Sequence, residues 1–243
     1  DLSCPRIEVE LRKIRHNTRT VVERLKGRGI RVTAVNKAVC GHPAIAQAML
    51  DGGAAGLAEA RLSNVKRLRQ TGMTCPITLI RTPMLSQVDE VVQVCDASYN
   101  TEISVIAALA SAALRQNTAH GIILMVELGD LREGIMPQDI GYVVQQVVDM
   151  HGVALKGIGA NFACLSGMAP SATKMQALTA LANEVEGQCG PFLETVSGGN
   201  SANLPWAFSA RATGRINDLR LGEAILLGVD PVTQEQIGGL FRD

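Results

Sequence analysis

The chain has 243 residues, a length typical of one (β/α)8 barrel, and its 47% hydrophobic content is enough to fill a large core. Its 23 basic and 23 acidic residues cancel, which argues against nucleic acid or an anionic membrane as partner and favours a small molecule or a protein partner. The six cysteines show no metal-ligand spacing, so we predict no metal site and free thiols in a reducing cytoplasm. No apolar run approaches the roughly 20 residues of a membrane-spanning helix.

The hydrophobic pattern alternates along the chain between a strand-like period of two and a helical period of 3.6. The predicted strands are, in order, residues 6–11, 30–39, 56–59, 76–80, 96–99, 121–128, 153–160, 193–197 and 216–221. The predicted helices are residues 14–25, 43–50, 62–70, 85–94, 102–116, 138–150, 173–186, 204–210 and 223–227. Eight or nine such units with short connections predict one domain over residues 1–243, a closed barrel of parallel strands. A doubly wound open sheet is the alternative, but no Gly-x-Gly-x-x-Gly turn follows the first strand.

In a (β/α)8 barrel the functional residues lie at the carboxyl ends of the strands. The ends of the predicted strands carry many polar side chains, namely Lys37, Glu59, Arg61, Arg81, Asn100, Glu127, Arg132, Asn161, Ser197, Ser201, Arg220 and Glu223. Lys37 stands out because it ends an apolar run, where loss of water around the ammonium would favour the neutral amine. We therefore interpret Lys37 as a candidate nucleophile toward a carbonyl group.

A phosphate site is the second feature that the strand ends predict. Residues 197–201, Ser-Gly-Gly-Asn-Ser, offer backbone N–H groups and hydroxyls just before a short helical stretch. Barrels often bind phosphate after their seventh and eighth strands, and this segment and Gly222-Glu223 both fall there. A flexible Gly/Ser turn is the alternative interpretation of residues 197–201.

Four motifs resemble, in order and spacing, the alanine racemase-like fold type III family of pyridoxal-phosphate enzymes. They are residues 34–42, 126–134, 196–201 and 219–228. Within that family they are similar to the branch of predicted amino-acid racemases that includes ornithine racemase. The resemblance implies a (β/α)8 barrel, pyridoxal 5′-phosphate as cofactor, an amino-acid substrate such as ornithine, and a homodimer in the full-length form.

The resemblance also implies catalytic roles for three cationic residues. Lys37 would hold pyridoxal phosphate covalently and act as the base on one face of the substrate's α-carbon; otherwise it is a surface lysine. Arg132 would lie near the cofactor's phenolic oxygen and the substrate carboxylate; otherwise it forms a salt bridge with Glu133 or Asp130. Arg220 would face the pyridine nitrogen and keep it unprotonated, which favours racemisation over side reactions; otherwise it forms an ion pair at the barrel end.

The remaining residues that the resemblance points to bind the cofactor. Ser201 would hold the phosphate by its hydroxyl, and Gly222 and Glu223 by their backbone N–H groups. Asn161 stands where alanine racemases carry a histidine near the cofactor ring, and it could instead cap the turn after its strand.

Racemases of this family continue into a C-terminal β domain, which supplies a tyrosine as the base for the opposite face across a dimer interface. This sequence stops fifteen residues after Gly228, and its two tyrosines, Tyr99 and Tyr142, lie in no matching motif. We therefore expect the N-terminal barrel of a longer racemase, without that β domain. A barrel-only pyridoxal-phosphate homeostasis protein without catalytic activity is the main alternative, and a fold type III lyase or decarboxylase is a third.

Overall fold

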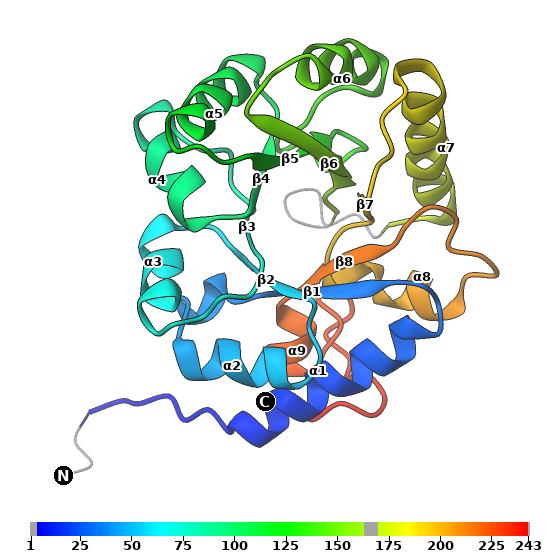
Figure 1. Ribbon diagram of the computed structural model, residues 1–243. Coiled ribbons are helices and arrows are strands. Elements are labelled where there is room, and N and C mark those ends of the chain that lie inside the picture. The colour runs from blue at the N-terminus through cyan, green and yellow to red at the C-terminus, as the bar shows by residue number, and fades with distance from the viewer. Residues whose placement is uncertain (1–3, 163–169, 243) are drawn as a thin grey trace.

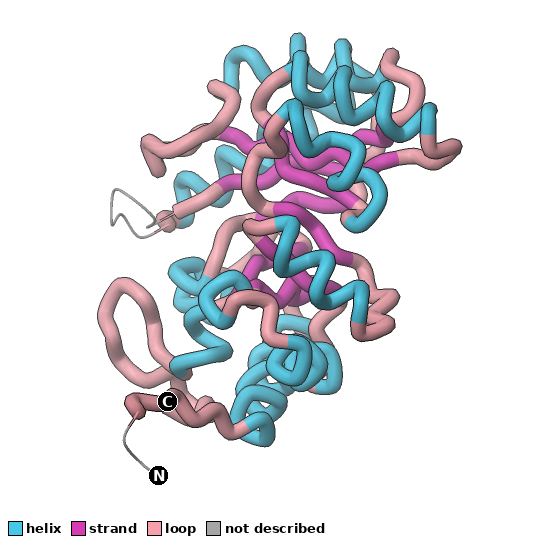
Figure 2. The backbone as a smooth tube through the Cα atoms, turned by 90° about the vertical axis from the view of Figure 1, so that its left-hand side faces the viewer, coloured by secondary structure: helices cyan, strands magenta, loops and turns pink. Residues whose placement is uncertain are grey.

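The computed structural model describes residues 4–162 and 170–242, and these form a closed barrel of eight parallel strands. The strands follow one another in sequence order, and the last pairs with the first, with Thr33 opposite Arg220. Helices surround the strands on the outside (Figure 1; Figure 2). The predicted (β/α)8 barrel is confirmed, and the open doubly wound sheet is wrong.

The elements have the following bounds. The strands are β1 Arg31–Val35, β2 Gly56–Glu59, β3 Ile77–Leu79, β4 Ala97–Asn100, β5 His120–Val126, β6 Val153–Ala160, β7 Thr195–Ser197 and β8 Asp218–Leu221. The α-helices are α1 Leu11–Lys26, α2 Pro43–Asp51, α3 Leu62–Gln70, α4 Val88–Val94, α5 Ile103–Arg115, α6 Ile140–Val148, α7 Ala172–Cys189, α8 Leu204–Ser209 and α9 Glu223–Leu227. Short 3-10 helices are η1 Lys37–Val39, η2 Leu85–Gln87, η3 Pro137–Asp139 and η4 Ser201–Asn203.

The prediction of a strand over residues 6–11 is wrong. Residues 5–10 form no regular element and extend away from the barrel (Figure 1), and the side chain of Ile7 is 93% exposed. An alternating pattern makes pairing possible, but a strand also needs a neighbour for its N–H and C=O groups. A closed barrel offers no edge on which residues 6–11 could pair. The barrel therefore begins at β1, the strand that leads to Lys37.

Aliphatic side chains fill the layer between the sheet and the helices, whereas the lumen of the barrel is more polar. The apolar cluster inside the lumen is small and consists of Tyr99, Ile123 and Met125, with Ile80 packed against it. Around it the lumen carries Thr33, Asp218 and Arg220, which also line a second cavity of about 350 Å³. Five of the six cysteines are free, as predicted, and Cys164 lies outside the described residues.

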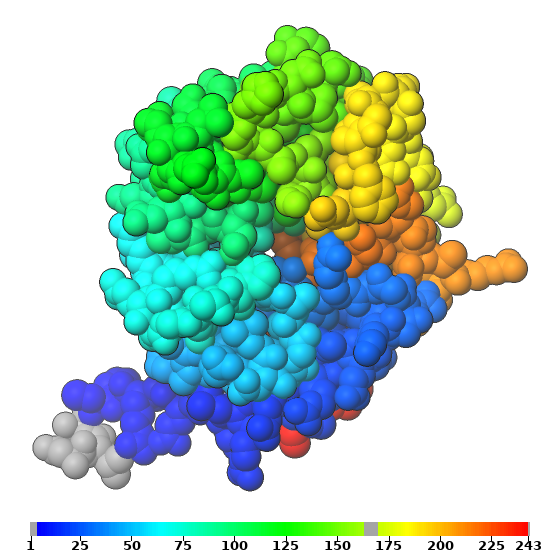
Figure 3. Space-filling view, viewed as in Figure 1, coloured from blue at the N-terminus to red at the C-terminus, as the bar shows by residue number. Residues whose placement is uncertain are grey.

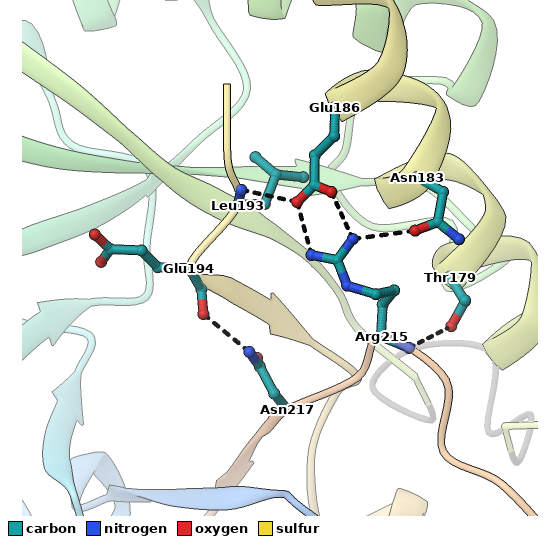
Figure 4. Close-up of polar contacts among 7 residues, drawn as sticks. All are labelled: Thr179, Asn183, Glu186, Leu193, Glu194, Arg215 and Asn217. Carbon is teal, nitrogen blue, oxygen red and sulfur yellow. Dashed lines mark hydrogen bonds and ion pairs between the residues drawn. The ribbon is translucent and has the colours of Figure 1, made fainter. Parts of the chain in front are cut away.

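A polar cluster attaches the segment before β8 to α7 (Figure 4). The guanidinium of Arg215 donates to both carboxylate oxygens of Glu186 at 2.6 Å, and also to Oδ1 of Asn183 at 3.0 Å. The backbone N–H of Arg215 donates to the hydroxyl of Thr179, and that of Leu193 donates to Glu186 at 2.9 Å. Glu186 thereby joins α7 to the segments that lead into β7 and β8.

Glu186→Gln should lower the free energy of unfolding by about 1 kcal/mol at pH 7, because one bidentate, partly buried pair is lost. The hydrogen bonds from Arg215 lower the pKa of Glu186 below its ordinary value of 4.5. A carboxyl whose pKa is lower in the folded state stabilises the fold above its unfolded pKa and loses that effect as the pH falls through the folded pKa. Urea unfolding from pH 7 to pH 3 should therefore show the wild type and the variant converging below about pH 4.5.

The control for that variant is Glu23→Gln, which changes an exposed carboxylate on α1. Its unfolding free energy should stay within about 0.5 kcal/mol of the wild type at every pH. A difference between Glu186→Gln and the wild type that did not change with pH would contradict the role given to the Glu186–Arg215 pair.

Candidate functional site

One cavity of about 390 Å³ lies at the carboxyl ends of the strands, and the predicted site residues line it. All seven of them line it: Lys37, Arg132, Asn161, Ser201, Arg220, Gly222 and Glu223. These residues are widely separated in sequence and meet because parallel strands of a barrel all end on the same side. The lining also includes Arg81 and Glu133, to which the sequence motifs gave no role.

Lys37 is the first residue of η1 and is separated from the end of β1 only by Asn36, and its side chain is exposed. The expectation that Lys37 is desolvated by burial is therefore wrong: in this turn the lysine points out of the packed strand and lines the cavity. The turn is tight, with the N–H of Gly41 donating to the carbonyl of Asn36 at 3.0 Å. A Cβ on Gly41 would lie 2.8 Å from Cβ of Asn64, and φ is +61°, so this position favours glycine.

A buried carboxylate fixes the residue before Lys37. Glu59, at the end of β2, is fully buried and accepts from the N–H of Ala60 at 2.8 Å and from the amide of Asn64 at 3.1 Å. The side-chain amide of Asn36 donates to its second oxygen at 2.9 Å when its nitrogen faces Glu59. A buried charge needs such partners, so these three donors hold Glu59 and Asn36 together and set the start of η1.

Arg220 is buried in the lumen under the cavity, and its guanidinium donates several hydrogen bonds. It donates to the hydroxyls of Ser197 and Tyr99, the latter at 3.1 Å, and to the carbonyl of Ala160 at 2.8 Å. It also donates to Oδ1 of Asn161 at 2.5 Å, so Asn161 faces the guanidinium inside the cavity. The guanidinium carbon lies 4.7 Å from the centre of the Tyr99 ring, a cation–π distance.

Asp218 is a buried acidic residue beside this network. It lies two residues before Arg220 on β8. Asp218 accepts from the hydroxyl of Ser197 at 2.6 Å and from that of Thr33 at 2.6 Å. Among the described residues Arg220 forms no direct ion pair, so the Ser197 hydroxyl stands between the two charges. The alternative of a direct ion pair at the barrel end is therefore not what the structure contains.

Neither tyrosine of the chain lines the cavity. Tyr99 is 3% exposed, and burial raises the pKa of its phenol above the ordinary value, which keeps it neutral next to Arg220. Tyr142 is 66% exposed and lies on α6, outside the barrel. The described residues thus place one lysine at the cavity and no tyrosine.

The segment predicted to hold phosphate forms a turn that side-chain hydrogen bonds cap. Asn200 caps η4: its side chain accepts from the N–H of Ala202, and the side chain of Asn203 accepts from the N–H of Asn200. Gly199 has φ +124°, and a Cβ there would clash with the Asn203 side chain. The hydroxyl of Ser201 accepts from the N–H of Ala224 at 3.1 Å. That bond joins η4 to the start of α9, where Gly222 and Glu223 lie.

The loop after β5 folds back and carries Arg132 and Glu133 to the cavity. The carboxylate of Glu127 accepts from the N–H groups of Gly129 and Leu131, at 2.6 and 3.2 Å. The N–H of Ile135 then donates to the carbonyl of Met125 at 2.7 Å. No ion pair joins Arg132 to Glu133 in the described parts of the chain, 4–162 and 170–242.

The described residues contain no group of three His, Cys, Asp or Glu side chains that could hold a metal ion. In the part of the chain that the structure covers, no helix has both the length and the apolar character needed to cross a membrane.

The chain is a (β/α)8-barrel protein with a cavity at its strand ends that is suited to an anionic small molecule. Four cationic side chains line this cavity: Lys37, Arg81, Arg132 and Arg220. The sequence model of the family "Alanine racemase, N-terminal domain" matches residues 9–231, and the chain belongs to this family.

Two curated relatives match over nearly the whole chain. Lysine racemase of Thermotoga maritima is 34% identical over 239 residues, and the match covers 98% of this chain and 67% of that protein. Ornithine racemase of Acetoanaerobium sticklandii is 30% identical over 240 residues, with the same coverage of both chains. The chain thus spans about two thirds of the length of these relatives.

Solved structures share the fold at lower sequence identity. The alanine racemase of Clostridium difficile 630 in complex with cycloserine has a TM-score of 0.82 at 18% identity, covering 100% of this chain and 66% of that one. The D-threonine aldolase of Filomicrobium marinum has a TM-score of 0.79 at 17% identity, covering 100% and 67%. The same barrel therefore occurs in proteins whose names give different reactions, and the site must decide the function.

Proposed function

We propose that this chain is the pyridoxal-phosphate-binding barrel of an amino-acid racemase that interconverts the L and D forms of ornithine or a similar amino acid. The observation that carries the proposal is the convergence of Lys37, Arg132, Arg220 and Ser201 on one cavity. Membership of the alanine racemase N-terminal domain family and the names of the two curated relatives support it. The proposal includes a homodimer for the full-length protein and a cytoplasmic location.

The donor set of the cavity fits pyridoxal phosphate. The cofactor needs an amine near its aldehyde, donors for a phosphate dianion and a partner for its ring nitrogen. Lys37 supplies the amine, and Arg220 with its neighbour Asn161 supplies the partner for the ring. The Ser201 hydroxyl and the N–H groups of Gly222 and Glu223 supply donors for the phosphate at the joined starts of η4 and α9.

Pyridoxal phosphate, when bound, draws electrons from the α-carbon of an attached amino acid and so acidifies its α-proton. In the proposal Lys37 would hold the cofactor, and its amine would take or return that proton on one face of the α-carbon. Arg132 binds the substrate carboxylate, for which its planar fork of donors is suited. In the proposal the positive charge of Arg220 would face the ring nitrogen and disfavour its protonation.

The deciding experiment incubates the protein, loaded with pyridoxal phosphate, with L- and with D-amino acids in deuterated water. We expect the enantiomer of ornithine or of a similar amino acid whose α-proton faces Lys37 to gain α-deuterium, measured by mass spectrometry, and chiral chromatography follows conversion to the other enantiomer. Cofactor-free protein is the control. A bound cofactor without exchange for any amino acid would contradict the racemase proposal and favour the alternative, a non-catalytic pyridoxal-phosphate-binding homeostasis protein.

A further inference from the structure

The cavity contains two carboxylates among its cationic side chains. The cations that line it are Lys37, Arg81, Arg132 and Arg220, and the carboxylates are Glu133 and Glu223. The proposed chemistry uses the Glu223 backbone and leaves both carboxylates unassigned. A carboxylate in the cavity repels both a phosphate and an α-carboxylate, because like charges repel. The carboxylates therefore need an explanation of their own.

The position of Glu133 is set by a tightly built loop. Residues 127–135 return to β5, where the N–H of Glu127 donates to the carbonyl of Ile135 at 2.9 Å. Gly134 lies directly on this contact: a Cβ there would approach the backbone nitrogen of Glu127 to 2.6 Å. Backbone contact on both sides of Gly134 therefore holds Glu133 at the end of β5, beside the cavity.

One hydrogen bond orients the carboxylate of Glu133, and no ion pair with a described residue offsets its charge. The hydroxyl of Thr82, from the loop after β3, donates to its Oε2 at 3.2 Å. Arg132 is its neighbour in sequence and Arg81 is the neighbour of Thr82, yet no ion pair joins either arginine to Glu133 within the described residues. Glu133 is half-buried, so its charge is only partly screened by water and remains available to a cation.

We propose that Glu133 binds the ammonium at the end of the substrate's side chain, so that the site selects α-amino acids with a terminal amine. This inference rests on the proposed racemase function. The Cα atoms of Arg132 and Glu133 are about 3.8 Å apart, as in any trans dipeptide, and both side chains are long. Two such neighbours can hold the α-carboxylate and the distal ammonium of one short diamino acid. Glu223 is less suited, because its carboxylate is exposed at the end where the phosphate donors lie.

The test compares ornithine with norleucine, which has a methyl group where ornithine has its ammonium and is otherwise of the same shape. Each amino acid is titrated into the cofactor-loaded protein, and the change in cofactor absorbance gives an affinity that does not depend on turnover. Exchange of the α-proton gives kcat/KM for both compounds. Wild-type protein should bind ornithine more tightly than norleucine.

Glu133→Gln should weaken the binding of ornithine and its kcat/KM by about 10- to 100-fold, the size of a charge-assisted hydrogen bond, and leave norleucine unchanged. Thr82→Val, which removes only the orienting hydroxyl, should weaken the binding of ornithine by about 2- to 10-fold. Glu23→Gln on α1 is the matched control and should change neither compound. Equal loss for ornithine and norleucine, or no loss for either, would overturn the proposal.

The two proposals can fail separately. Absence of exchange for every amino acid contradicts the racemase function, whereas an ornithine preference that survives in Glu133→Gln contradicts the role of Glu133. A binding preference for ornithine that disappears in Glu133→Gln supports the role of Glu133 even if turnover is absent.

Discussion

Lys37→Ala should remove the near-visible absorbance of lysine-bound pyridoxal phosphate and lower exchange of the α-proton by about 10³-fold or more. Lys37 is the only lysine that lines the cavity among the described residues, so no other lysine of the lining can take over the covalent bond or the proton. The side chain is exposed, and its loss should leave the free energy of unfolding within about 0.5 kcal/mol of the wild type. Absorbance spectra, exchange in deuterated water and urea unfolding measure the three quantities.

Lys66→Ala is the matched control, because Lys66 forms a surface ion pair with Glu90 away from the cavity lining. It should keep the absorbance and the exchange rate of the wild type. Retention of the cofactor absorbance in Lys37→Ala would show that another lysine anchors the cofactor and would remove the main support for the proposed roles around it.

Arg220→Met should lower the free energy of unfolding by about 3–5 kcal/mol, the usual effect of removing one member of a buried charged network. Met fills part of the space but donates nothing to Tyr99, Ser197, Ala160 or Asn161, and it leaves Asp218 in the lumen without the nearby positive charge. Urea unfolding of the protein with and without pyridoxal phosphate measures the effect. The shift in stability caused by the cofactor should also become smaller, because the variant lacks the proposed partner of the ring nitrogen.

Two further variants show whether the effect comes from the network. Arg220→Lys keeps the charge but not the planar fork of donors, so it should recover only part of the lost stability. Arg115→Met removes an arginine from an exposed pair with Asp89 and should change stability by less than about 1 kcal/mol. A loss for Arg220→Met no larger than that for Arg115→Met would contradict the description of the lumen as one coupled network.

The alternation of strand and helix patterns was sufficient to predict the closed barrel, because local periodicity and short connections leave few other arrangements. The strand predicted over residues 6–11 fails for a physical reason that the sequence does not contain. Pairing depends on a free sheet edge, and the edge that the first strand would need is already used by the β1–β8 contact. Local patterns report what a segment could form, whereas pairing partners are set by the whole fold.

The candidate site was predictable as a set of residues but not as a network. Strand ends and family motifs pointed to Lys37 and Arg220, and both line the cavity. The exposure of Lys37 depends on the turn into η1, and the restraint on Asn36 depends on Glu59 from the next strand. Such contacts join residues of different strands, and the sequence pattern within one strand does not predict them. Arg81 had a visible signal, a charged residue at the end of a predicted strand, but no motif distinguished it.

The pairing of β8 with β1 has a consequence for how the protein folds. The first and last strands lie side by side (Figure 1), although Thr33 and its partner Arg220 are far apart in sequence, and the blue and orange parts of the chain adjoin on the surface in Figure 3. Contacts of such long sequence separation form slowly, because closing the long loop between them costs conformational entropy. Lys37 follows one of these strands and Ser201 contacts the helix after the other, so the cavity exists only once the ring has closed. A ligand that touches both sides of that seam would therefore slow the opening of the barrel, and its effect should appear mainly in the unfolding rate.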